Sequence, residues 1–356
     1  MALSVMSYHY YSWIFGDIGS EYLLGKLGMY AVAIFYVLSG LSLTIVYQNK
    51  VSSRSDVLSF FIKRFFRIFP LFWLATTCML SFRIGNCYLH DLSLKYSIYE
   101  ILLNYSLLFG FVKPTVYIPI GGWSIGNEMV FYAVFPFIFL MSRRWKLIIP
   151  VLTFVSIAIG LYWAFFLINP NVIVSDQWAL YVNPFNQLYF FMAGVLIGAY
   201  EESLRRVLSK PICYSMLALA IIIFWLYPVS GDQVQIATGV SRVILSACSI
   251  SIVLFVFLLS PKLNRFFSIP LAFLGEGCYS IYLLHALVPW PILFVLYRLN
   301  VVHYAIVSYS ISFFLTFIVI WFTFNYLEKP TMKIGQDVSQ WVKAGKIKVK
   351  GDEKLS

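Results

Sequence analysis

Charged residues are scarce in this sequence. Only 12% of its 356 residues are charged, and 15 residues are acidic. Soluble globular domains carry about 25% charged residues, so this composition excludes that class. Nucleic-acid binding is excluded as well. The net charge is +11, but the basic residues lie in short loops between apolar segments and form no continuous stripe.

The sequence also lacks the patterns of a disulfide framework or a metal site. Its five cysteines are scattered and form no CxxC pair: Cys78, Cys87, Cys213, Cys248 and Cys278. Its four histidines show no HExxH-type spacing: His9, His90, His285 and His303. We therefore expect no disulfide framework and no metal ion.

Hydrophobic residues are abundant instead. They make up 61% of the chain, aromatic residues make up 19%, and the mean hydropathy is +0.82. This composition predicts an all-α polytopic membrane protein, a bundle of about ten transmembrane helices. The apolar stretches that approach spanning length lie near residues 1–15, 27–48, 65–82, 123–141, 147–167, 184–200, 211–228, 239–259, 270–295 and 304–326.

Segment 98–112 is the ambiguous stretch. Its apolar run is shorter than the ~20 residues that a span needs, and it contains Glu100 and Asn104, so we expect it to be re-entrant or interfacial. Charge supports this interpretation. With about ten spans, most of the lysines and arginines fall on one side of the membrane, which the positive-inside rule assigns to the cytoplasm together with both termini. An eleventh span would move every basic residue from Arg143 onward to the other side.

The charge pattern also predicts two regions. We expect a transmembrane domain over residues 1–328 and a cytoplasmic basic tail over residues 329–356. The last part of this tail is polar and rich in lysine, a composition suited to a surface of anionic lipid.

A basic cluster lies at the mouth of one expected span. The stretch FFIKRFFRIFPLFW (60–73) contains Lys63, Arg64 and Arg67. A fixed cation near the hydrocarbon boundary costs about 1 to 3 kcal/mol, so it either marks topology or holds an anion. Arg64 and Arg67 are three residues apart and therefore share one helix face that could grip a phosphate. From the spacing alone, an anchor and an anion site both stay open.

Further charged or titratable side chains lie inside expected spans. Glu128 requires a partner there, so we expect it to pair with a cation such as Arg242 or to line a polar cavity; a purely structural ion pair is equally open. Glu276 and His285 share the stretch LGEGCYSIYLLHALVPWP. They are about 13 Å apart along a helix and do not form a dyad by themselves. We assign Arg242, Glu276 and His285 to a candidate polar core, although His285 also fits a structural role.

His9 is the stronger candidate for a general base. It lies in ALSVMSYHYYSW, where weakly acidic tyrosines are the only other titratable side chains. Imidazole gains and loses a proton near neutral pH, which suits that role, whereas a hydrogen-bonded core histidine is the structural alternative. The run LSGLSL (38–43) supplies small residues for close helix packing. The end of the last span, FNYLEKP, is interpreted as a helix terminator with a surface charge at Glu328.

These segments, taken in order, resemble one family. The first-span histidine is followed by LGMYAVAIFYVLSGLSL, FIKRFFRIFPLFW, WSIGNEMVFYAVFP, GCYSIYLLHALV and FNYLEKP. The series is similar to the acyltransferase family 3 membrane O-acyltransferases over nearly the whole chain. No single segment is decisive, but their common order makes a chance match improbable.

The resemblance implies a function. It implies transfer of an acetyl group from acetyl-CoA to a sugar hydroxyl of a cell-surface or lipid-linked polysaccharide, by a multi-pass protein of the bacterial inner membrane. It further implies that Arg64 and Arg67 bind acyl-CoA and that His9 is catalytic. Glu128 and His285 match positions of the family motifs, and we expect Glu128 to orient His9 or another polar core group.

One feature departs from the family pattern. Members usually carry an arginine eleven residues before the first-span histidine, and here that position would precede Met1. The first span is also short. A start codon assigned too far downstream or a truncated chain would explain both observations.

Two alternatives from other classes stay open. In a transporter or flippase of a lipid-linked glycan, the charged residues within the spans and His285 would line a pathway. Such a protein would tolerate the loss of His9. In a scaffold for polysaccharide assembly, every buried polar group would be structural, and the loss of Arg64 or Arg67 would leave function intact.

Overall fold

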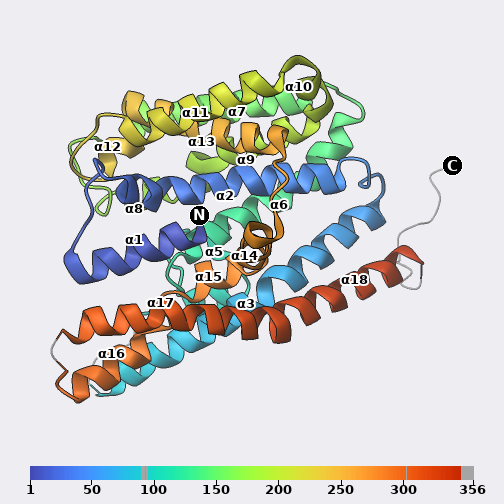
Figure 1. Ribbon diagram of the computed structural model, residues 1–356. Coiled ribbons are helices and arrows are strands. Elements are labelled where there is room, and N and C mark those ends of the chain that lie inside the picture. Colours follow the sequence, from blue (N-terminus) through green and yellow to red (C-terminus); the bar gives the residue numbers. More distant parts are fainter. Residues whose placement is uncertain (90–92, 94, 302, 346–356) are drawn as a thin grey trace.

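The structure, a computed structural model, describes residues 1–89, 93, 95–301 and 303–345 (Figure 1). Every regular element in these ranges is a helix, in agreement with the predicted all-α class. In chain order they are α1 (Ala2–Phe15), α2 (Leu23–Tyr47), α3 (Arg54–Leu89), α4 (Ile98–Tyr105), α5 (Phe109–Val112), α6 (Gly122–Ser142), α7 (Ile148–Tyr162), the π-helical turn η1 (Trp163–Leu167), α8 (Trp178–Tyr181), α9 (Pro184–Ala199), α10 (Glu201–Val207), α11 (Lys210–Leu226), α12 (Val234–Ala237), α13 (Gly239–Leu259), α14 (Arg265–Glu276), α15 (Cys278–Leu284), α16 (Pro289–Arg298), α17 (Tyr304–Thr323), the π-helical turn η2 (Phe324–Glu328) and α18 (Lys329–Lys343).

Seven helical segments within the described residues are long and apolar enough to cross a membrane. An eighth is formed when α10 and α11, which meet at a 102° bend, count as one broken span. The chain is therefore a multi-pass membrane protein. The other two of the expected spans correspond to α1 and α9, of 14 and 16 residues. At 1.5 Å per residue they are about 21 and 24 Å long, less than the ~30 Å of a hydrocarbon core.

Segment 98–112 does not cross the membrane. It forms α4 and α5, of 8 and 4 residues, which are far too short to span. The amide of buried Asn104 holds the chain that follows: Nδ2 donates to the Val116 carbonyl at 2.6 Å, and Oδ1 accepts from the Ile118 amide at 2.8 Å. These bonds satisfy backbone groups that a lipid environment would leave without partners.

The helices are arranged in two groups (Figure 1). In one group α2, α7, α9, α11 and α13 pack on one another. In the other, α3 runs alongside the continuous segment of α17, η2 and α18. Helices α1 and α15 lie between the groups, and α1 contacts α2, α15 and α17. This arrangement places the first-span histidine in the interior of the bundle.

The run LSGLSL lies where α2 and α9 approach most closely. A Cβ added at Gly40 would lie 2.1 Å from the Phe191 carbonyl oxygen, and one at Gly194 would lie 2.0 Å from the Val37 carbonyl oxygen. Backbones can come this close only where side chains are absent. The expectation of small-residue helix packing is therefore confirmed.

We predict that Gly194→Ala destabilises the protein by about 1 to 3 kcal/mol, because the added methyl group forces α2 and α9 apart. Gly275→Ala is the matched control, since a Cβ there meets open space. It should leave stability unchanged or raise it slightly. Thermal unfolding of the two purified variants in the same detergent compares them. Equal midpoints would contradict the close approach.

The beginning of the predicted tail is a helix that packs on α3. Ser59 and Ser339 share a hydrogen bond of 2.6 Å, and Lys343 Nζ lies 2.5 Å from Asp56 Oδ1. The helix continues from the last span through η2 into α18. Residues 346–356 of the tail lie outside the described part of the chain.

Candidate active site

Two histidines meet face to face between the two groups of helices. His9 lies on α1, and His285 follows the last residue of α15. Their ring centroids are 5.3 Å apart with an interplanar angle of 18°. His285 is fully buried, whereas His9 is half-buried. The structure thus joins two candidate residues that are 276 positions apart, a pairing that the sequence did not reveal.

Hydrogen bonds fix the orientation of the His285 ring. Its Nδ1 lies 2.7 Å from the Tyr282 carbonyl oxygen, and a carbonyl only accepts, so Nδ1 carries a proton. The Tyr10 hydroxyl donates to the His285 carbonyl at 2.8 Å and ties α1 to this turn. The buried Nε2 has no hydrogen-bond partner within the described residues. It remains available to a ligand or a water molecule.

Trp13 completes a stack of rings with the histidines. It lies one turn after His9, at a centroid distance of 5.2 Å and an interplanar angle of 20°. Its distance to His285 is 6.2 Å. The indole covers both imidazoles, so it limits access from that side.

Glu128 lies in a second polar cluster. The Tyr132 hydroxyl, one turn along α6, donates to Glu128 Oε2 at 2.9 Å, and Ser39 Oγ lies 2.8 Å from the same hydroxyl. Arg64 and Arg67 lie close enough for their positive charges to attract this carboxylate. The expectation that Glu128 lines a polar region agrees with these contacts, but its charged neighbours are the arginine pair and not Arg242. No hydrogen bond joins Glu128 to His9 in the described ranges.

Arg64 and Arg67 face the same interior region, as their spacing predicts. The Arg64 guanidinium lies 5.9 Å from the ring centre of Tyr47 and 6.0 Å from that of Tyr132. Arg67 Nη1 lies 3.1 Å from the sulfur of Met332. Neither arginine forms an ion pair within 4.0 Å of a described carboxylate. Both guanidinium groups therefore retain donors for an anion.

Glu328 belongs to this cluster, although the sequence suggested a surface charge. The structure overturns that interpretation: the side chain is 1% exposed. Ser280 Oγ donates to its Oε1, and the Arg67 charge acts on it. The π-helical turn η2 places Glu328 on the inner face of the helix. Periodicity could not reveal this, but the presence of FNYLEKP among the family-like segments could have.

Two of the residues assigned to the polar core lie elsewhere. Arg242 is 4% exposed, but its guanidinium donates to the Ala237 and Asn186 carbonyls, both at 2.9 Å. It holds helix ends together and is not a partner of Glu128. Glu276 is exposed at the end of α14, because the helix breaks at Gly277 before α15 begins. The placement of Glu276 in a polar core was wrong.

Along α3, the histidine pair lies between the levels of Ile68 and Phe82. The Tyr279 hydroxyl donates to the Ile68 carbonyl at 2.9 Å, which places the start of α15 beside the arginine pair. Farther along, Trp290 packs on Phe82 with ring centroids 4.6 Å apart. His285 falls between Tyr279 and Trp290 in the chain. A group bound by the arginines and a group bound near Phe82 would therefore approach the histidines from opposite ends.

Comparison with known proteins identifies the family. The acyltransferase-domain profile of acyltransferase family 3 matches residues 1–325. The chain belongs to acyltransferase family 3. This membership and its relatives make it an O-acyltransferase.

Two curated relatives match this family 3 acyltransferase. The exopolysaccharide production protein ExoZ of Rhizobium meliloti (strain 1021) is 28% identical over 277 residues, which cover 75% of this chain and 77% of ExoZ. "Putative acetyltransferase ORF330" of Acidianus two-tailed virus is 25% identical over 247 residues, which cover 67% of this chain and 68% of that protein. No solved structure matches the chain significantly.

Proposed function

We propose that this acyltransferase moves an acetyl group from acetyl-CoA to a sugar hydroxyl of a cell-surface or lipid-linked polysaccharide. The histidine pair carries the proposal, because it sets an imidazole suited to general-base chemistry beside the buried Nε2 of His285, which has no partner among the described residues. The relative named for exopolysaccharide production supports a glycan acceptor. The relative named as a putative acetyltransferase supports the acetyl group.

The chemistry requires few groups. His9 accepts the proton of the acceptor hydroxyl as its oxygen forms a bond to the thioester carbonyl carbon. The carbon–sulfur bond then breaks, and the leaving thiolate takes a proton from the imidazolium, so the acetyl ester and free coenzyme A are released. Transient acetylation of His9 is the covalent variant of the same exchange. General-base assistance accelerates such a reaction about 10²- to 10⁴-fold, so the positioning of the two substrates must supply much of the remaining rate enhancement.

We assign acetyl-CoA to the polar cluster of Arg64, Arg67, Glu128 and Glu328. Guanidinium groups bind phosphate oxygens in bidentate fashion, and those of this pair are not held by described carboxylates. From there, an extended thioester arm would point along α15 toward His285. Glu128 would act on the donor side through Tyr132 and not by direct contact with His9.

Topology completes the proposal. We assign the chain to the bacterial inner membrane, with ten membrane-entering helices and both termini in the cytoplasm. The short helices α1 and α9 would complete their crossings where the bilayer thins locally around the bundle. The arginine pair then faces the cytoplasm, where acetyl-CoA is made. The loops rich in lysine and arginine support this orientation.

Two of the residues expected to line a transport pathway argue against the transporter alternative. Of the residues that would line a pathway, Arg242 is bound to backbone carbonyls and Glu276 is exposed. Glu128 and His285 also occupy different clusters and share no hydrogen bond within the described residues.

The test is transfer of isotopically labelled acetyl from acetyl-CoA into glycan by membranes that contain the chain. We predict label in the glycan fraction, released by mild alkali as expected for an ester, and none with matched membranes that lack the chain. Unlabelled glycan whose export changes with the chain would instead support the flippase.

A further inference from the structure

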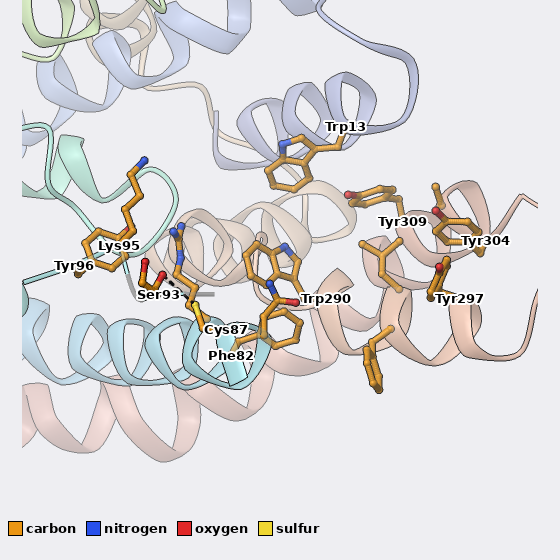
Figure 2. A pocket seen from close by; sticks show the side chains of 15 residues that line it. Trp13, Phe82, Cys87, Ser93, Lys95, Tyr96, Trp290, Tyr297, Tyr304 and Tyr309 are labelled. Atoms are coloured by element: carbon orange, nitrogen blue, oxygen red, sulfur yellow. Dashed lines mark hydrogen bonds between the residues drawn. The ribbon is translucent and has the colours of Figure 1, made fainter. Parts of the chain in front are cut away.

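A large cleft lies at the C-terminal end of α3 (Figure 2). It lies on the far side of the histidine pair from Arg64 and Arg67. Its volume is about 730 Å³, and its lining comes from α1, α3, α16 and α17 and from the segment before α4. Trp13 forms part of its wall, so only one ring separates the cleft from His9. The cleft therefore adjoins the reacting group without overlapping the donor cluster.

Aromatic side chains dominate the walls of the cleft. Figure 2 shows Trp290 in its middle, with Trp13 and Tyr309 on one side and Phe82 on the other. Trp13 and Tyr309 lie 5.8 Å apart, and Trp290 packs edge to face on Phe82. Rings that combine an apolar face with a polar edge suit ligands of the same mixed character. Sugar rings have this character, since apolar C–H faces alternate with hydroxyl edges.

The charges of the cleft have one sign. Its lining includes Arg83 and Lys95, and none of the described residues that line it is acidic. Arg83 lies 5.2 Å from the ring centre of Tyr96, and its buried Nε has no hydrogen-bond partner in the described part of the chain. Neither cation forms an ion pair with a described carboxylate. A half-buried guanidinium with free donors favours a carboxylate or phosphate.

Position separates this cation from the donor site. Arg67 and Arg83 lie on the same helix, sixteen residues apart, which corresponds to about 24 Å along the axis. The histidine pair lies between these levels. Two anionic ligands could therefore bind at once, one at each end, with their reactive groups directed toward His9.

We propose that this cleft binds the acceptor and that Arg83 selects an anionic saccharide, one that carries a carboxylate or a phosphate. The proposal rests on the proposed function, since it assigns the acceptor of that reaction. The anionic group that Arg83 would bind can come from two parts of the acceptor. The anion is either part of an acidic sugar or the phosphate that joins a saccharide to its lipid carrier.

Binding tests the proposal without acetyl transfer. Equilibrium dialysis of the full chain in nanodiscs would use three probes: trigalacturonate, its methyl ester and farnesyl phosphate. We expect the wild type to bind at least one anionic probe. Arg83→Gln should weaken that binding about tenfold to a hundredfold, as expected for loss of a charge-assisted pair. Arg83→Lys should recover part of it.

Controls make the outcomes distinct. Arg298→Gln removes an exposed arginine of α16 that does not line the cleft, and it should change nothing. Lys95→Gln provides a second cleft variant in case Arg83→Gln fails to fold. If the wild type prefers trigalacturonate over its methyl ester and Arg83→Gln removes that preference, the ligand is an acidic sugar. If farnesyl phosphate is the only probe whose binding depends on Arg83, the ligand is the phosphate of the lipid carrier. Anion binding that is absent or independent of both cleft cations overturns the proposal.

Failure of the proposed function has a different signature. In that case the wild type transfers no acetyl group, whatever it binds. If acetyl transfer occurs but the cleft shows no preference for anions, only the assignment of the acceptor is wrong.

Discussion

Replacement of His9 by asparagine is expected to reduce acetyl transfer by about 10²- to 10⁴-fold, the contribution of a positioned general base. Asparagine keeps a polar side chain of similar reach but cannot accept and return the proton. The loss should appear in kcat, with the KM for acetyl-CoA nearly unchanged, because the arginine cluster that we assign to the donor lies elsewhere. Initial rates with labelled acetyl-CoA at matched protein levels measure both constants.

His303→Asn is the matched control. His303 is exposed at the start of α17, and its φ of 56° is a left-handed conformation that asparagine tolerates. This variant should retain wild-type activity. Equal rates for His9→Asn and wild type would rule out catalysis by His9 and restore the structural interpretation of that residue.

Local patterns predicted much of this protein. Apolar run length located the long helices, and the three-residue spacing of Arg64 and Arg67 correctly placed both on one face of α3. The small residues of LSGLSL also packed as expected. In each case the relevant information lies within a few turns of one helix, so hydrophobicity and periodicity suffice.

Contacts between distant segments explain the errors. A buried carboxylate requires a partner, but the sequence does not say which cation provides it. Glu128 lies near the arginines of α3, whereas Arg242 binds backbone carbonyls. The sequence suggested an exposed Glu328 because this residue ends a span, but η2 packs against α3 and Ser280 of α15 donates to the buried carboxylate. Arg83 was not singled out, since an isolated cation near a helix end has no local signature.

The arginine pair presents two functions that one experiment can separate. As topological anchors, Arg64 and Arg67 would act through net charge alone, and any nearby lysine could replace them. As a phosphate site, they would act through the planar fork of guanidinium, which a lysine ammonium does not reproduce. We favour the second function as a hypothesis, because neither guanidinium lies within 4.0 Å of a described carboxylate and both keep donors for an anion.

We therefore expect Arg64→Gln and Arg67→Gln each to raise the KM for acetyl-CoA by about tenfold to a hundredfold, the loss of one charge-assisted hydrogen bond of about 1.5 to 3 kcal/mol. Arg64→Lys should fall between glutamine and wild type. Lys63→Gln removes the same charge from the adjacent position and should leave KM unchanged. Reagent accessibility of Gln336→Cys, at an exposed position of α18, reports orientation in all four variants. If all four leave KM unchanged, or if Lys63→Gln raises KM as much as Arg64→Gln does, the pair acts only as an anchor. The donor site must then lie elsewhere.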